Sequence, residues 1–324
     1  MVKSYGFAVG NLRARENTLL SKSDFATLMA AKSVEELSAL IGEKSGGVFE
    51  KMSVPELLSK KQKALWEYIT DIAPDMDIFA PFLYENDFHN LKAILKAVVG
   101  EKDFSSLLKE PSTVECELIA TAVKEKRFDI LPELLRETAI KAYDILTKSG
   151  DTQACDCVID AALIDARMKT ANKTGNKTII ELISIDAFYK NIKVALRSAK
   201  AGKSPAFLDE VLSENGIVSI ADLKAAAISG EEKVLELLSS KTNAGGKEAA
   251  ECYKASPSSF EKFADNMVLL AAKKCKSVTI GIEPLIGYTV ACLTEIKNLR
   301  IIYSGIKTGQ SSEKIEERLR EVYG

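Results

Sequence analysis

Apolar residues recur at three- and four-residue spacing along most of this 324-residue chain, which is the pattern of amphipathic α-helices. The clearest stretches are residues 33–41, 110–126, 131–148, 219–227 and 311–323. Ser33 and Ser112 each stand three residues before a glutamate, which predicts capping boxes at two helix starts. The alternation of apolar and polar positions that is typical of strands is nowhere sustained. The sequence therefore predicts an all-α fold.

Three segments of the chain resemble one another. They are HNLKAILKAVVG (89–100), KNIKVALRSAKAG (190–202) and KNLRIIYSGIKTG (297–309). Each contains an asparagine, an apolar residue and a basic residue in succession, and each ends at a glycine. Apolar residues follow the asparagine at positions one, four, five and eight, which is one face of a helix. Any amphipathic helix would show such a face, but the shared triplet and the closing glycine indicate a true internal repeat.

The triplets are Asn90–Lys92, Asn191–Lys193 and Asn298–Arg300, and the closing glycines are Gly100, Gly202 and Gly309. A fourth, weaker copy begins at Asn11, with Tyr5 six residues before it. In that copy Arg15 and Glu16 interrupt the apolar face.

Four such markers bound three units, which we place at residues 1–89, 90–190 and 191–297, with 298–324 closing onto the first. If the units form a ring, the N- and C-terminal segments complete one domain together. We therefore predict three similar helical bundles around an approximate threefold axis.

Charge and composition exclude several kinds of function. Lys and Arg number 44 against 46 Asp and Glu, so no overall positive charge favours nucleic acid. The single histidine, His89, excludes sites with two imidazoles, and lysines occupy its place in the other repeats. Cys155 and Cys157 are the best metal candidates, but no second Cys or His pair completes a zinc site. No Walker-type phosphate loop occurs. We predict no catalytic residue, metal site or cofactor.

The least polar long segment is residues 277–294, but Glu283 and Pro284 interrupt it. A charge inside a bilayer is costly, so we predict a buried helix with a break there and no membrane span. The first residues lack the pattern of a secretory signal, and six cysteines without one are typical of reduced thiols. The expected location is cytoplasmic.

Taken in order, four segments resemble the C subunit of archaeal and bacterial V/A-type rotary ATPases, the counterpart of the d subunit in the eukaryotic vacuolar enzyme. They are residues 5–25, 84–100, 186–202 and 287–324. The resemblance runs from end to end. It implies a funnel-shaped, all-helical protein of three similar domains, without catalytic activity of its own. Such a protein is monomeric in its complex, peripheral to the cell membrane, and joins the central shaft to the membrane rotor ring.

Matched residue by residue, the resemblance implies structural or interface roles for two groups of positions. The first is Tyr5, Asn11, Arg13 and Arg15, and the second is Asn90, Lys92, Asn191, Lys193, Asn298 and Arg300. The basic residues of the triplets either face an axial partner or pair with acids inside their own bundles. Ser304 stands where the other repeats have Lys96 and Arg197, so the three domains differ there. Apart from the resemblance, the same periodicity would fit a free-standing helical repeat scaffold that binds another protein.

Overall fold

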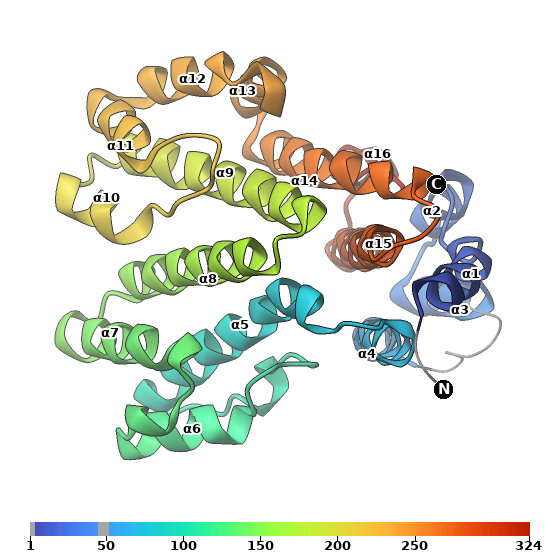
Figure 1. Cartoon of the computed structure of the whole chain (residues 1–324), viewed down its shortest axis with the longest axis horizontal. Coiled ribbons are helices and arrows are strands. Elements are labelled where there is room, and N and C mark those ends of the chain that lie inside the picture. Colours follow the sequence, from blue (N-terminus) through green and yellow to red (C-terminus); the bar gives the residue numbers. More distant parts are fainter. Residues whose placement is uncertain (1–3, 45–51) are drawn as a thin grey trace. The chain divides into compact units, whose positions relative to one another are not determined.

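A computed structural model describes residues 4–44 and 52–324, and every regular element in these two ranges is a helix (Figure 1). The predicted all-α fold is confirmed. The chain divides into two compact units: unit 1 joins Met1–Met76 to Lys247–Gly324, and unit 2 is Asp77–Gly246. Unit 1 thus contains both terminal segments of the chain. The division into three similar bundles and the funnel shape stay predictions.

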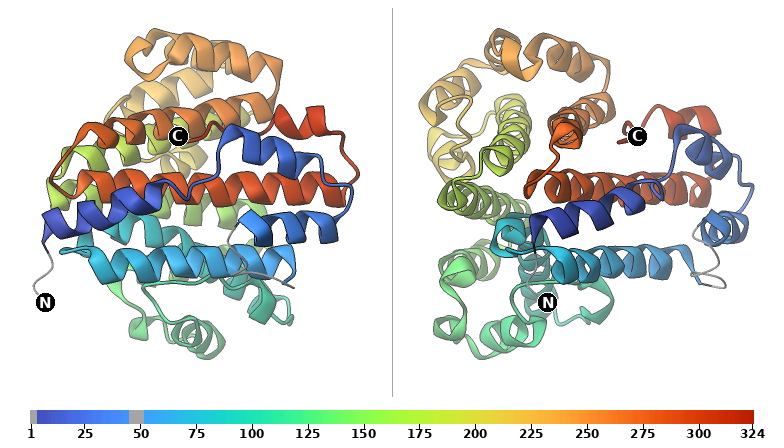
Figure 2. Two further views of the ribbon diagram at one scale, coloured as in Figure 1. Left: turned by 90° about the vertical axis from the view of Figure 1, so that its right-hand side faces the viewer. Right: turned by 45° about the vertical axis from the view of Figure 1, so that its right-hand side comes forward.

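Unit 1 is built around a long helix near the C-terminus. Its elements are α1 (Tyr5–Glu16), α2 (Lys22–Met29), α3 (Val34–Lys44), α4 (Val54–Ile72), α13 (Gly246–Ala255), α14 (Pro257–Lys273), η5 (Lys274–Ser277), α15 (Glu283–Lys307) and α16 (Ser312–Glu316). Figure 2 shows the red α15 lying alongside the blue α1 and α4. Fully buried Leu299 and Ile302 of α15 pack with Leu37 of α3 and Leu57 of α4, so the C-terminal repeat helix forms the centre of the N-terminal core.

Unit 2 consists of shorter helices that pack on three long ones. Its elements are η1 (Asp77–Phe79), α5 (Ala80–Val99), η2 (Ser105–Leu107), α6 (Cys116–Glu125), η3 (Phe128–Ile130), α7 (Glu133–Ser149), α8 (Thr152–Thr174), α9 (Lys177–Lys200), α10 (Pro205–Val211), α11 (Ile220–Ser229), α12 (Glu231–Ser240) and η4 (Thr242–Ala244). Leu91, Ile94 and Leu95 of α5 are fully buried against α6, α7 and α8.

Glu283 and Pro284 begin α15 and do not interrupt a helix, which corrects the predicted break. Proline is favoured in the first turn because it lacks an N–H, and a carboxylate there complements the positive end of the helix dipole. The preceding residues 278–282 are not helical. Within the described ranges, no helix is both long and apolar enough to cross a membrane.

The three repeat helices α5, α9 and α15 end in the same way. The residue eleven positions after each repeat asparagine has a positive φ: 53° at Glu101, 60° at Gly202 and 68° at Gly309. The next N–H then donates back to a carbonyl five residues earlier, at 2.8, 3.0 and 2.9 Å. This is the closure of a Schellman-type cap. Gly100, predicted to close the first repeat, lies one position too early with a φ of −90°, because that helix turns at Glu101 instead.

Glu101 occupies a conformation that costs an L-residue about 1 kcal/mol and that glycine adopts freely. We expect Glu101→Gly to raise the free energy of unfolding by up to that amount, although glycine usually destabilises. Gly202→Ala is the matched control, because an added Cβ there meets no atom within 4 Å and only the backbone strain changes. It should lower stability by about 1 kcal/mol. Urea denaturation measures both variants, and the same sign for both would contradict the equivalence of these helix ends.

Candidate functional site

The three repeat asparagines make the same pair of hydrogen bonds. Asn90 donates from Nδ2 to the carbonyl oxygen of Lys109 at 2.9 Å and accepts the N–H of Lys109 at 2.8 Å. Asn191 does so with Ser213, at 2.6 and 3.2 Å. Asn298 does so with Arg320, at 3.0 and 2.8 Å. We call this arrangement the asparagine clamp.

Each clamp holds a non-helical segment against the helix that carries the asparagine. The clamped residue follows the asparagine by 19 residues in the first repeat and by 22 in the others. The three asparagines are at most 1% exposed. A buried peptide group needs a donor and an acceptor, and a primary amide supplies both from one side chain. Aspartate could not donate and leucine could do neither, so the position requires an amide.

In the first repeat, a carboxylate three residues before the asparagine also holds the returning segment. Fully buried Asp87 accepts the backbone N–H groups of Thr113 at 2.7 Å and of Val114 at 3.1 Å. Burial raises the pKa of Asp87, and these hydrogen bonds oppose the rise. Because Asp87 already holds this segment, α6 begins at Cys116 and not after Ser112, so the capping box predicted there is wrong. The third repeat has Glu295 at the same position, and the second has Phe188.

The basic residue of the first triplet pairs inside its own bundle. Lys92 lies 2.8 Å from Asp160 of α8, and the neighbouring Lys96 lies 2.7 Å from Asp156 on the same helix. The sequence left open whether these basic residues face an axial partner or pair with acids inside their own bundles, and Lys92 does the latter. In the third triplet, Arg300 donates instead to the neutral amide oxygen of Gln62 on α4, at 3.0 Å. Lys193 is half-buried on α9.

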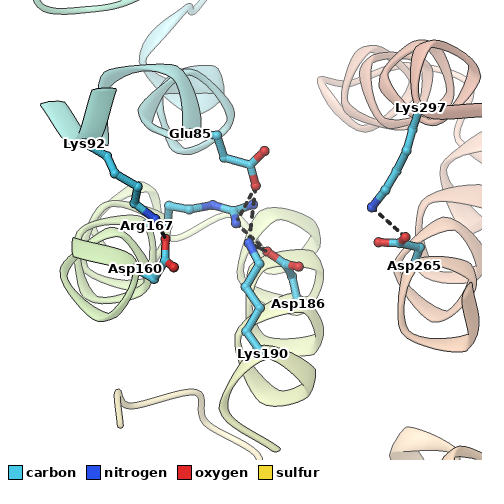
Figure 3. A network of polar contacts seen from close by, with 8 residues as sticks. All are labelled: Glu85, Lys92, Asp160, Arg167, Asp186, Lys190, Asp265 and Lys297. Atoms are coloured by element: carbon cyan, nitrogen blue, oxygen red, sulfur yellow. Dashed lines mark hydrogen bonds and ion pairs between the residues drawn. The ribbon is translucent and has the colours of Figure 1, made fainter. Parts of the chain in front are cut away.

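A cluster of four charged side chains joins α5, α8 and α9 (Figure 3). Arg167 of α8 is 5% exposed and pairs with Glu85 of α5 at 3.0 Å and with Asp186 of α9. Lys190 pairs with Asp186 at 2.8 Å and with Glu85 at 3.4 Å. We call these four residues the charge cluster. Burial alone would raise the pKa of Asp186, but the adjacent Lys190 and Arg167 hold it below its ordinary value.

Sequence reasoning missed the charge cluster, although part of its signal was present. Glu85 and Asp186 both stand five residues before a repeat asparagine, and Lys190 stands directly before one. Extending the repeat alignment toward the N-terminus would have found Glu85 and Asp186, and Lys190 already lies in the second repeat segment. Arg167 lies outside every repeat segment, so only the packing of α8 reveals it.

A smaller charged group in unit 1 involves the third clamp. Lys297, directly before Asn298, lies 2.6 Å from Asp265 of α14 (Figure 3). The Nε of the clamped Arg320 lies 2.6 Å from the same carboxylate. Asn266 also accepts the backbone N–H of Glu321 at 2.9 Å. The C-terminal segment is thus fixed by its backbone and by a side chain at once.

Asn11, the start of the weaker fourth copy, does not form a clamp. It is exposed on α1, and its Oδ1 accepts the hydroxyl of Tyr68 at 2.9 Å. Arg15 and Glu16 stand where the other repeats bury apolar residues, so α1 cannot pack on this face in the same way. Instead the Arg15 guanidinium carbon lies 4.1 Å from the centre of the Tyr68 ring.

The other two N-terminal residues predicted from the resemblance lie on the same helix. Tyr5 is the first residue of α1 and is half-buried. Arg13 pairs with Glu16 at 2.7 Å and donates to the carbonyl oxygens of Lys276 at 3.0 Å and Val278 at 2.9 Å. Arg13 thereby joins α1 to the segment that precedes α15.

The cysteine and histidine candidates lie in ordinary surroundings. Cys155 is buried in α8, and burial raises the pKa of its thiol to about 11, so it stays protonated at neutral pH. The Nε2 of His89 lies 2.9 Å from the carbonyl oxygen of Leu107. Over residues 4–44 and 52–324, no group of three or more His, Cys, Asp or Glu side chains could hold a metal ion.

Comparison with known proteins gives one family model that covers nearly the whole chain. The model of the ATP synthase (C/AC39) subunit matches residues 8–318. The chain belongs to this family. The repeats, clamps and charge cluster described above all lie within the matched residues or at their edge.

Two curated relatives agree with the C/AC39 assignment over most of their length. The C subunit of a V-type sodium ATPase from Enterococcus hirae is 22% identical over 96% of this chain and 97% of its own. The C subunit of an A-type ATP synthase from Methanocaldococcus jannaschii is 26% identical over 97% of this chain and 86% of its own. The resemblance seen in the sequence, to the C subunit of V/A-type ATPases, is confirmed. The C/AC39 family is thus one of accessory subunits of these ATPases.

The clamp can be tested by removing one amide. We expect Asn191→Ala to lower the free energy of unfolding by about 3 kcal/mol, because two hydrogen bonds are lost and the buried peptide atoms of Ser213 are left without partners. The control is Asn11→Ala, which loses a single bond at an exposed site and should cost about 1 kcal/mol or less. Urea denaturation near neutral pH compares the two. Equal losses would show that the clamp contributes no more than an ordinary hydrogen bond.

The charge cluster predicts a dependence of stability on acid. The pKa of Asp186 is lower in the folded protein than its ordinary 3.8, so its ionised form stabilises the fold above that pH and the effect is lost as the pH falls further. Asp186→Asn should therefore be less stable than the parent chain, by a margin that shrinks between about pH 5 and about pH 2.5. Asp144→Asn, which loses one exposed ion pair to Lys148, should differ little at either pH. A margin for Asp186→Asn that does not change with pH would contradict this.

Proposed function

We propose that this chain is a non-catalytic central-stalk subunit of a V/A-type rotary ATPase or ATP synthase. It links the cytoplasmic rotor shaft to the membrane rotor ring and transmits torque between ATP turnover and H⁺ or Na⁺ transport. The observation that carries this proposal is the family match over residues 8–318, together with relatives named as the C subunits of V-type and A-type complexes. In this role the chain is cytoplasmic, peripheral to the membrane through its partners, and present as a single copy.

Resistance to deformation is the physical property that torque transmission requires. Helices packed at interior density deform little under load. Here α9 has 24 residues and α15 has 25, and each is tied to a returning segment by an asparagine clamp. The charge cluster adds fixed contacts between α5, α8 and α9. These features support a stiff coupling element.

Contacts to a partner need polar groups that are not already committed to strong pairs. Lys92 is paired with a carboxylate of α8, whereas exposed Arg300 bonds, among residues 4–44 and 52–324, to a neutral amide alone. Among the basic residues of the triplets, Arg300 is therefore our first candidate for a contact to the shaft. The asparagines serve a structural role in this proposal.

The coupling role can be tested in membrane vesicles that carry the complete complex. We expect removal of this chain to leave ATP hydrolysis measurable while ATP-driven ion uptake falls to the level seen without ATP. Adding back the purified chain should restore uptake in a saturable manner. Arg300→Glu should need a higher concentration for the same recovery, and Arg127→Glu, an exposed change in unit 2 with one weak ion pair, should not. Hydrolysis by a colorimetric phosphate assay and uptake by an ion-sensitive dye are the two measurements.

Unchanged ion uptake after complete removal of the chain would overturn the proposal. A chain that co-purifies from native membranes with unrelated proteins, and without shaft or ring subunits, would favour the free-standing scaffold instead.

A further inference from the structure

A cavity of about 590 Å³ opens within unit 1, between α1, α3, α4 and α15. Pockets of roughly 300–1,000 Å³ are the size that small organic ligands occupy. Its apolar lining includes Leu20, Ile41, Leu65 and Ile296. Neither the charge cluster nor the clamps contribute to this lining, so the cavity is a separate feature of the fold.

The charged side chains that line the cavity are mostly positive. They are Arg15, Lys44 and Lys61, against the single carboxylate of Glu295. Lys61 lies 2.7 Å from Glu295, so the charges of these two residues cancel. Lys44 lies 2.6 Å from Asp24, a residue outside the lining.

Arg15 is the cation in this cavity that can accept an anionic ligand. No carboxylate pairs with it in the part of the chain that the structure describes, and its guanidinium stacks on the Tyr68 ring at 4.1 Å. Stacking uses the face of the guanidinium, whereas its N–H donors point outward in the plane of the group. The donors therefore stay open to an anion while the ring fixes the position of the charge.

Two further lining residues carry no charge at neutral pH. Burial raises the pKa of Cys292 to about 12 and raises the pKa of Tyr288 above its ordinary value of 10. Neither a thiolate nor a phenolate then offsets Arg15. The cavity combines an apolar wall, a neutral polar wall and an excess of positive charge.

We propose that this cavity binds an anionic single-chain amphiphile of the fatty-acid class. The carboxylate bonds to Arg15, and the alkyl chain lies against Leu65 and Ile296. A small inorganic anion would leave the apolar wall in contact with water, and an uncharged hydrocarbon would leave the Arg15 donors unused. The site does not depend on the proposed coupling role, because its lining is formed by residues of unit 1 and needs no partner protein.

Isothermal titration calorimetry of the full chain with dodecanoate, below its micellar concentration, tests the proposal. We expect saturable binding of one molecule per chain, and much weaker binding of dodecanol, which has the same chain without the charge. Trp66, the single tryptophan, directly follows the lining residue Leu65, so its fluorescence should change along the same binding curve.

Two variants separate the charge from the apolar wall. Arg15→Gln should weaken dodecanoate binding at least about tenfold, or about 1.4 kcal/mol. Ala64→Leu leaves all charges in place but fills part of the cavity, and it should reduce binding by a similar factor. Lys60→Gln is the matched control, because Lys60 is exposed beside Lys61 on α4 and does not line the cavity. It should bind as the parent chain does, and thermal unfolding verifies that all three variants are folded.

Three results would overturn the proposal: no saturable binding of dodecanoate, equal affinity for dodecanol, or unchanged affinity in both Arg15→Gln and Ala64→Leu. The first would show that the cavity does not bind a ligand of the fatty-acid class. The second would remove the role of Arg15. The third would place the bound molecule elsewhere on the chain.

Discussion

A buried amide that pairs with one peptide group is the interaction on which the repeated part of this structure depends. Each repeat helix is followed by a segment that is not helical where it returns to the helix, and the peptide groups of such a segment need partners that regular structure does not supply. Asn90, Asn191 and Asn298 provide them at full burial. Because the amide offers its donor and acceptor in a fixed geometry, it sets both the distance and the register of the returning chain. The apolar residues beside each asparagine are then buried in a defined order.

Ion pairs between helices add to these clamps and restrict how the helices can pack. A buried charge is tolerated only with a partner in good geometry, so an ion pair inside a bundle penalises alternative packings even where it adds little net stability. Arg167 contacts carboxylates from two other helices, and a shift of α5 or α9 would remove one of its two partners. In unit 1, Asp265 has the corresponding effect on Lys297 and Arg320. The clamps fix each segment to its helix, and the charges fix helices to one another.

The sequence predicts the helices and the repeat because both depend on side-chain periodicity. It does not predict the clamped residues, which are lysine, serine and arginine, because the clamp binds backbone atoms that every residue has. Asn11 shows the opposite error: its local triplet matches the repeat, but Arg15 and Glu16 prevent the burial that a clamp requires. The position of a left-handed residue is also ambiguous in the sequence, since the first repeat uses Glu101 although a glycine stands beside it. The cavity at Arg15 depends on four helices from both ends of the chain, which no local pattern brings together.

The three repeats share the asparagine clamp but differ in the residues around it. A connector can therefore vary these surrounding residues without changing the clamp. Position six after the asparagine is Lys96, Arg197 or Ser304, and Lys96 forms an ion pair with Asp156 of α8. Position three before it is Asp87, Phe188 or Glu295, so one repeat replaces a buried carboxylate with an aromatic ring. None of these changes touches the two hydrogen bonds of the clamp. A repeated frame with independent surroundings lets each repeat acquire its own contacts while the clamp is kept, which suits the proposed role of joining two different partners.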